Sequence, residues 1–492
     1  MSHRALAVAA LFATVLTACT HTSQATTATP SPSLPTPGSV KWSDCGGGFQ
    51  CGSLTVPLDY ANPDKGTIKL ALIRKVATDP LHRIGSVLTN PGGPGASGID
   101  YLRSAAAGMR NLNKRFDLIG FDPRGIGQSA PVRCLTAAQE DAFNALDPVL
   151  DDPQEKAAAI QADQQFVAGC EATSGKVLPY VGTPNAARDM DEIRAAVGDA
   201  KLTYLGFSYG TYLGEWYAHL FPTHVRALSL DGVIDPTLSA NDMLLAQVVS
   251  FEKNLEAFIA DCKARPDCQF GRSGDPMAKI LSLLQSLDSN PLQVGNRQLT
   301  RALAIYGIGT PLYDPGSWPY LDQGLTAAVQ GNGRLLLAFS DLYLGRNPDG
   351  TYTNETDANF AVNCLDHPVP TDISAYDRLQ TEFTNASAAF GAAFQYSNLP
   401  CAYWPVKPAG EPAALTDDGA PPILLVGGTN DPATPYAWAQ AANRQIANSV
   451  LLTRQGNGHV SYDKSQCAQQ AEDDYLISLT LPASGTTCTD SA

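Results

Sequence analysis

The sequence has few basic residues, no long apolar run beyond its first 20 residues, and no closely spaced pair of cysteines. Lys and Arg number 33 against 48 Asp and Glu, so the net charge is −15. Because phosphate binding needs a basic surface, nucleic acid is excluded as the main partner. No later segment approaches the roughly 18 consecutive apolar residues of a membrane-spanning helix. No two cysteines have the C-x-x-C spacing typical of zinc and redox sites, and we expect no metal.

The chain does have enough apolar material for a large folded core. Its 492 residues are 44% hydrophobic and 16% charged, which excludes an intrinsically disordered chain. At roughly 150 residues per domain, the length allows about three domains, or one core with a large insertion.

The first 39 residues have the composition of a leader and a tether. Residues 5–16 form an apolar run behind a short basic start, as in a signal peptide that ends at residue 18. The run ends in Leu16-Thr17-Ala18-Cys19, which resembles a bacterial lipobox. This resemblance implies a lipid on Cys19 that anchors the protein to the membrane outside the cytoplasm; an ordinary signal peptide is the alternative. Residues 19–39 are rich in Thr, Ser and Pro and are expected to form an extended tether.

The cysteine count fits an oxidising compartment. Of 11 cysteines, ten remain after Cys19, which is an even number, as a set of disulfides requires. Sequence alone does not fix their connectivity, and we expect a structural role for them. Local spacing suggests the pairs Cys45 with Cys51, Cys134 with Cys170, Cys262 with Cys268, Cys364 with Cys401, and Cys467 with Cys488.

Short apolar runs alternate with helical patterns along most of the chain. The runs at residues 86–89, 202–205 and 423–426 are soon followed by glycine or proline, which is typical of strands buried on both faces. Strands that alternate with helices predict an α/β fold with a parallel sheet. A mostly helical stretch breaks this rhythm. We predict that it is an inserted second domain rather than core helices with long loops, and that it covers residues 236–415, between core segments 40–235 and 416–492.

A Gly-x-Ser-x-Gly motif at residues 206–210 is the strongest chemical signal. A strand pattern precedes it and an amphipathic helix pattern follows it, as a nucleophile elbow needs. The turn of such an elbow is so sharp that Gly206 and Gly210 must be nearly free of side chain. Ser208 is the predicted nucleophile, and the backbone N–H of Tyr209 is a predicted oxyanion donor.

A serine hydroxyl needs a base and an acid to become a nucleophile. In this type of fold the acid and then the histidine follow the serine along the chain. Asp431 comes directly after one apolar strand pattern, and His459 follows the next on a glycine-rich turn. Because ligands of open α/β sheets bind beside the carboxyl ends of strands, we expect both near Ser208. His459 would transfer the proton and Asp431 would orient the imidazole. The sequence Asp366-His367 competes, but it falls in the predicted insertion.

The turn Asn90-Pro91-Gly92-Gly93-Pro94-Gly95 follows an early strand pattern. A tetrahedral intermediate needs a second backbone N–H beside the one after the serine, and a glycine-rich turn lets the backbone approach the substrate closely. Gly93 is the predicted second donor.

Six strings in order resemble one family: NPGGPG, FDPRGIGQS, GFSYGTYLG, LDGVIDP, GGTNDPATP and GNGH. They are similar to the actinobacterial tripeptidyl aminopeptidase group, which belongs with the proline iminopeptidases among the α/β-hydrolases, and the resemblance covers nearly all of residues 42–488. It implies an α/β-hydrolase fold with a helical cap, and a serine exopeptidase that needs no metal or organic cofactor and acts on peptides with a free N-terminus. By motif, the triad is Ser208, Asp431 and His459, and the oxyanion hole is Gly93 with Tyr209.

Alternatives stay open beside this interpretation. Some members of the group act mainly as carboxylesterases with the same triad, and the turn at residues 90–95 lacks the histidine that precedes the glycines in iminopeptidases. A binding lipoprotein with an inactive hydrolase fold is disfavoured by the complete Ser/Asp/His set. A cap carboxylate is expected to recognise the ammonium group of the substrate. Asp242, Glu252 and Asp314 are candidates, and the sequence singles out none of them.

Overall fold

The computed structural model describes residues 38–408 and 410–489. The predicted signal peptide, the lipid-anchor residue Cys19 and nearly all of the tether therefore lie outside the described residues. Among the helices of the described part, none is long and apolar enough to cross a bilayer.

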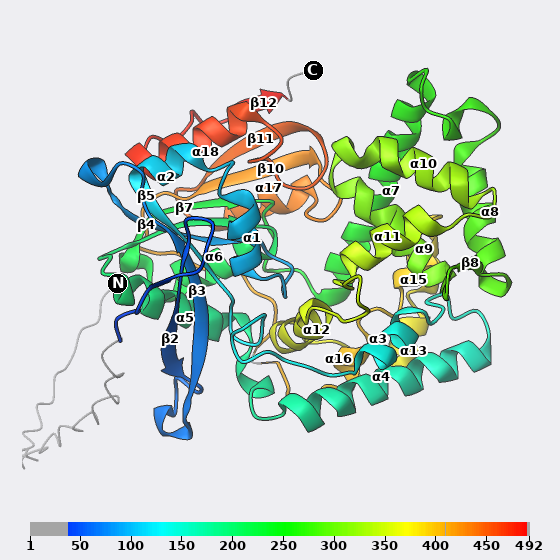
Figure 1. Cartoon of the computed structure of the whole chain (residues 1–492), viewed down its shortest axis with the longest axis horizontal. Helices are drawn as coiled ribbons and strands as arrows, with labels where there is room; N and C mark the ends of the chain where they lie inside the picture. The colour runs from blue at the N-terminus through cyan, green and yellow to red at the C-terminus, as the bar shows by residue number, and fades with distance from the viewer. Residues whose placement is uncertain (1–37, 409, 490–492) are drawn as a thin grey trace, which may run out of the picture. The chain divides into compact units, whose positions relative to one another are not determined.

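A ten-stranded sheet carries the core, in the order β1-β2-β3-β5-β4-β6-β7-β10-β11-β12 (Figure 1). The first three strands pair antiparallel, as does β3 with β5, and every pair from β5 to β12 is parallel. The predicted parallel α/β sheet is thus confirmed. The strands are β1 Ser43–Asp44, β2 Gln50–Pro57, β3 Thr67–Lys75, β4 Gly85–Asn90, β5 Phe116–Phe121, β6 Leu202–Phe207, β7 Val225–Asp231, β10 Leu424–Asn430, β11 Val450–Asn457 and β12 Thr487–Thr489.

The central strands are apolar throughout because both faces of the sheet are covered. In β6, Leu202 and Tyr204 pack into one apolar cluster, whereas Leu205 and Phe207 pack into the cluster on the opposite face. One set of three helices packs into the first cluster, together with parts of α4 (Pro153–Ser174) and α12 (Glu355–Asp366), and a second set of three packs into the other cluster. The sheet is therefore sandwiched between helical layers. The first set is α5 (Thr183–Ala196), α6 (Tyr209–Leu220) and α17 (Tyr436–Gln445); the second is α1 (Gly98–Ala105), α2 (Arg110–Arg115) and α18 (Gln466–Ser478).

Between β7 and β10 the chain leaves the sheet and forms mostly helices (Figure 1). Many of these helices share an apolar cluster of their own, separate from the two clusters on the sheet. The predicted limits of the insertion, 236 and 415, stay a prediction. The helices between β7 and β10 are α7 Ala240–Ala264, α8 Pro276–Ser289, α9 Arg301–Gly309, α10 Trp318–Ala328, α11 Arg334–Tyr343, α12 Glu355–Asp366, α13 Ile373–Asp377, α14 Gln380–Ala386, α15 Gly391–Phe394 and α16 Leu399–Ala402, with a hairpin of β8 Leu292–Val294 and β9 Arg297–Leu299.

Two helices from an earlier part of the chain contact this inserted region. They are α3 (Ala137–Asn144) and α4 (Pro153–Ser174), which lie between β5 and β6 in the sequence. Asp141 of α3 accepts a hydrogen bond from Arg346 (2.7 Å), and Asp147, which follows α3, accepts one from Arg301 of α9 (2.7 Å). By position along the chain alone, this segment falls within the predicted core segment 40–235.

Disulfides join the described part of the chain at five places, and the pairs are those that local spacing suggested. One lies near the first strands, one joins the segment before α3 to α4, two lie in the inserted region, and one ties α18 to β12. They are Cys45–Cys51, Cys134–Cys170, Cys262–Cys268, Cys364–Cys401 and Cys467–Cys488.

Candidate active site

Ser208 stands on a sharp turn between β6 and α6. Its backbone has φ 55° and ψ −127°, in the left-handed region that a non-glycine residue rarely adopts. A Cβ on Gly206 would lie 2.5 Å from the carbonyl oxygen of Gly210, and one on Gly210 would lie 2.7 Å from that of Asn90. Both positions therefore require glycine, as the predicted elbow does.

Asp431 and His459 meet at the carboxyl ends of two neighbouring strands. β10 and β11 pair in parallel, so the residues that follow them emerge at the same edge of the sheet. His459 Nδ1 lies 2.8 Å from Asp431 Oδ1 and 2.9 Å from Oδ2. The carboxylate also accepts backbone N–H bonds from Ala433, Thr434 and Val460.

The charge state of Asp431 follows from these contacts. Burial raises the pKa of this carboxyl, but the charge of His459, the hydrogen bond to it and the backbone N–H donors outweigh burial, so the pKa lies below its usual value. Asp431 is therefore ionised at neutral pH, and His459 Nδ1 is the donor in the bond between them. The other ring nitrogen, Nε2, is left free to take a proton.

The glycine-rich turn at residues 90–95 lies directly against the elbow. A Cβ on Gly92, whose φ is 101°, would lie 2.8 Å from Ser208 Cβ and 2.9 Å from the backbone nitrogen of Tyr209. The Gly92 N–H donates to the side chain of Asn90 (2.9 Å), which fixes the start of the turn. The structure thus brings the turn and the first oxyanion donor together, and the choice of Gly93 as second donor stays a prediction.

The competing sequence Asp366-His367 forms no such acid–base pair. Asp366 accepts the backbone N–H of Thr183 (2.8 Å) and the Thr183 hydroxyl, and burial raises its pKa to about 7. His367 stacks on Tyr212 with ring centroids 5.6 Å apart, and burial lowers its pKa to about 4. Thr183 also bonds the Tyr209 hydroxyl, so Asp366 supports the residue after Ser208 indirectly.

A segment of the inserted region rests on the histidine turn. The His459 N–H donates to the carbonyl oxygen of Tyr313 (2.8 Å), and the two rings meet edge to face at 5.4 Å. A Cβ on Gly458 would lie 2.8 Å from Pro315 Cδ, so the approach is close. Sequence reasoning missed Tyr313 because no pattern near it indicates a contact about 150 residues away along the chain.

The three candidate acids for ammonium binding all hold local structure. Asp242 accepts from the Ser239 hydroxyl at the start of α7, Glu252 accepts from Ser387, and Asp314 accepts the N–H of Gly316. These hydrogen bonds do not identify any of the three acids as a substrate contact.

Comparison with known proteins places the chain in a family. Residues 386–488 match a family model described as TAP-like protein. Serine protease Hip1 of Mycobacterium tuberculosis is 38% identical over 483 residues, which cover 91% of each chain. This chain belongs to the TAP-like α/β-hydrolases. Carboxylesterase B of Mycobacterium tuberculosis is 37% identical over 451 residues, covering 89% of this chain and 86% of that protein. Tripeptidyl aminopeptidase of Streptomyces coelicolor is 34% identical over 471 residues, covering 91% and 86%.

The family assignment confirms the resemblance and the α/β-hydrolase fold inferred from the sequence. It also identifies this TAP-like chain as a serine hydrolase, in agreement with the elbow and the Asp431–His459 pair. The roles of the individual residues rest on the geometry and stay predictions.

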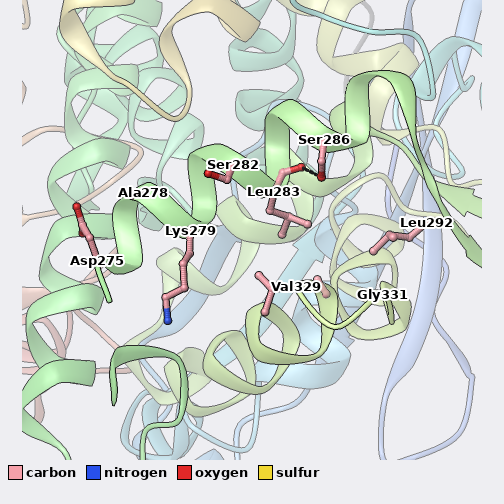
Figure 2. A pocket seen from close by; sticks show the side chains of 10 residues that line it. Asp275, Ala278, Lys279, Ser282, Leu283, Ser286, Leu292, Val329 and Gly331 are labelled. Atoms are coloured by element: carbon pink, nitrogen blue, oxygen red, sulfur yellow. Dashed lines mark hydrogen bonds between the residues drawn. The ribbon is translucent and has the colours of Figure 1, made fainter. Parts of the chain in front are cut away.

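The pocket in Figure 2 lies apart from the predicted site residues of this TAP-like hydrolase. It has a volume of about 540 Å³ and lies between α8 and the end of α10, with Lys279, Leu283 and Val329 among its lining residues. The Lys279 ammonium group donates to the carbonyl of Phe270. None of Ser208, Asp431 and His459 lines this pocket.

Two clusters of metal-type ligands occur in the described part of the TAP-like chain, and both have other partners. In the first, Cys262 and Cys268 are joined in a disulfide and have no free thiolate. In the second, Asp147 and Asp288 both pair with Arg301, at 2.7 and 3.2 Å, so a cationic side chain already lies between the acids. Neither cluster includes Ser208, Asp431 or His459.

Proposed function

We propose that this chain is a serine exopeptidase that releases di- or tripeptides from a free N-terminus through an acyl-enzyme on Ser208. The observation that most supports this proposal is that Ser208 lies on a strained strand-to-helix turn, at the same sheet edge as the hydrogen-bonded pair of Asp431 and His459. The similarity to a tripeptidyl aminopeptidase and a serine protease over 91% of the chain supports peptides as the substrate class.

The proposed mechanism assigns each group one task. Ser208 attacks the carbonyl carbon while His459 Nε2 takes the hydroxyl proton, and Asp431 stabilises the imidazolium that forms. The N–H groups of Tyr209 and Gly93 bind the oxyanion of the tetrahedral intermediate. His459 then gives its proton to the leaving amine, and water activated by the same histidine releases the acyl group.

A fluorophosphonate probe tests the nucleophile. Such a probe reacts covalently with a serine that is activated by a base, whatever the natural substrate. We expect wild type to be labelled and Ser208→Ala to be unlabelled. Equal labelling of the two proteins, or no labelling of wild type, would remove Ser208 from its proposed role and favour a binding protein with an inactive hydrolase fold.

Carboxylester hydrolysis is the second candidate, because a carboxylesterase is 37% identical to this chain. The same triad cleaves esters and amides, so the residues themselves do not separate the two. Comparing kcat/KM on tripeptide amides and on short acyl esters does. Activity on esters alone would replace the peptidase proposal.

We also infer that residues 236–415 form a cap over the site. The contact between Tyr313 and His459 supports this proposal, since it joins the inserted region to the catalytic turn. A cap of this kind would exclude water and leave room only for the end of a peptide. One of its carboxylates would bind the free ammonium group.

The proposed location is outside the cytoplasm, with a lipid on Cys19 holding the enzyme at the membrane. Disulfides support this location because cytosolic thiols are kept reduced. The Thr/Ser/Pro-rich tether of residues 19–39 would separate the enzyme from the lipid surface.

A further inference from the structure

Asp231, the last residue of β7, contacts the backbone at the predicted nucleophile and the backbone just after the predicted base. It is fully buried. Its backbone carbonyl accepts the N–H of Ser208 (2.9 Å). Its carboxylate oxygen Oδ2 accepts the N–H groups of Ser461 (2.6 Å) and Tyr462 (2.9 Å), which follow His459 by two and three residues.

The turn after His459 needs such support. Val460 has φ 57°, an unfavourable conformation for a β-branched residue. Its N–H is held by Asp431 Oδ2 (3.1 Å), and the next two N–H groups are held by Asp231. Two aspartates thus bind three successive N–H groups of the histidine turn, and one of these aspartates also binds the nucleophile's backbone.

The order of the strands explains why one residue can do this. β7 lies between β6, which leads to Ser208, and β10, which leads to Asp431. The end of β7 is therefore the central point of the catalytic edge. A residue at this position can bind the Ser208 backbone through its main chain and the histidine turn through its side chain, and so influence the distance between them.

We propose that Asp231 is a positioning residue that sets the distance between Ser208 and His459. The inference rests on the proposed function, in which these two residues react together. Asp231 touches no substrate. It acts by holding the backbone on which the nucleophile and the base are carried.

The Asp231 carboxyl group is costly to bury. Asp231 Oδ1 has no hydrogen-bond partner among the described residues, and the same is true of Oε1 of the buried Glu472 on α18. Burial raises the pKa of both carboxyl groups, and a neighbouring carboxylate raises the pKa of each one further. The positive charge of Arg454 on β11 lowers the pKa of Asp231. Burying incompletely paired carboxyls costs free energy of folding. At this cost Asp231 supplies an acceptor oxygen for two N–H groups of the histidine turn, which supports a positioning role that an amide oxygen could also fill.

Asp322 on α10 offers a matched control. It is also buried, and its Oδ1 also accepts two consecutive backbone N–H groups, those of Gln269 (3.1 Å) and Phe270 (2.7 Å), within the inserted region. Asp231→Ala and Asp322→Ala remove the same kind of contact, so both are expected to lower the melting temperature. Only Asp231→Ala is expected to lower kcat, by about 10²-fold with KM nearly unchanged, because a misplacement of about 1 Å costs about that much.

The rate of fluorophosphonate labelling separates positioning from substrate binding, since it needs the nucleophile and the base but no peptide. We expect this rate to fall with kcat in Asp231→Ala. We expect Asp231→Asn, whose amide oxygen accepts the same N–H groups, to recover most of it. The downfield proton resonance of the His459–Asp431 hydrogen bond should shift or broaden in Asp231→Ala and stay in place in Asp322→Ala. Should Asp231→Ala not fold, Asp231→Ser, which is too short to reach both N–H groups, carries the same expectation.

The outcomes separate this inference from the proposed function. The positioning role would be overturned if Asp231→Ala were labelled as fast as wild type, or if Asp231→Ala and Asp322→Ala lost kcat equally. Either result would leave the proposed function in place. Absence of labelling in wild type, or labelling of Ser208→Ala, would overturn the proposed function itself.

Discussion

At the scale of single residues, the site depends on side chains that are absent as much as on those present. Ser208 accepts a strained backbone because Gly206 and Gly210 leave space around it. Gly92 extends the same requirement to the neighbouring turn. These glycines allow three backbone segments to approach more closely than any Cβ would permit.

Replacing Gly92 by alanine tests this close approach. The new Cβ would lie 2.6 Å from the carbonyl oxygen of Phe207 and 2.8 Å from Ser208 Cβ, so the turn must move away from the elbow. We expect kcat to fall by about 10² or more, as when an oxyanion donor is lost. Gly66→Ala is the control, since Gly66 has a similar φ of 109° with nothing within 4 Å of its Cβ position. Equal kinetics for the two variants would contradict the role of the turn.

Asp431→Asn tests the electrostatic role of the acid. The amide cannot stabilise the imidazolium and favours the wrong tautomer of His459, and an equivalent change in another triad lowers kcat by about 10⁴. Steady-state kinetics should show a loss of that order with the melting temperature little affected. A loss below about tenfold would assign the acid role to another carboxylate.

Ser208, Asp431 and His459 could be predicted as site residues because a motif or a strand end marks each of them. The sequence did not predict Asp231, Thr183 or Tyr313 as residues of the site. Their contacts join segments far apart along the chain, and the local sequence indicates none of these contacts, although Asp231 lies in the string LDGVIDP. Tertiary packing alone brings them to the site.

At the scale of elements, alternating strands and helices were sufficient to predict the parallel sheet. The strand at residues 423–426 is found at Leu424–Asn430, with the predicted acid directly after it. The contact of α3 and α4 with the inserted region was not predicted. A helix pattern shows which of its faces is apolar but does not show which partner covers that face.

The buried Glu140 of α3 predicts a pH effect on stability. Burial, and then the neighbouring Asp357 on α12, raise the pKa of Glu140 on α3 from 4.5 to about 8. Between these values the folded protein holds a proton that the unfolded chain releases, so the free energy of unfolding declines as pH rises through this window.

Glu140→Gln removes this proton linkage. We therefore expect the melting temperature of the variant, relative to that of wild type, to rise steadily from about pH 5 to about pH 8. Glu171→Gln, at an exposed position on α4, is the control and should show a constant difference across the same range. A constant difference for Glu140→Gln as well would show that Glu140 has no raised pKa.

At the scale of the whole molecule, we propose that a lipid on Cys19 anchors the disulfide-braced hydrolase to a membrane surface. Cys19→Ser tests the anchor. The variant should leave the membrane fraction and appear in the soluble extracytoplasmic fraction, because the proposed acyl chains supply the membrane affinity. Retention in the membrane fraction would contradict lipid anchoring at this residue. The lipobox and the tether are predictions from composition alone, and nearly all of their residues lie outside the described part of the chain.

The central claim is that Ser208 cleaves peptides whose N-terminus is free. The most direct measurement is kcat/KM for tripeptide amides with a free and with an acetylated N-terminus, for wild type and for Ser208→Ala. We predict that acetylation lowers kcat/KM by about 10² or more, since a carboxylate placed for an ammonium group would lose its partner, and that Ser208→Ala cleaves neither substrate. Equal cleavage of free and acetylated peptides, or activity that survives in Ser208→Ala, would contradict the account.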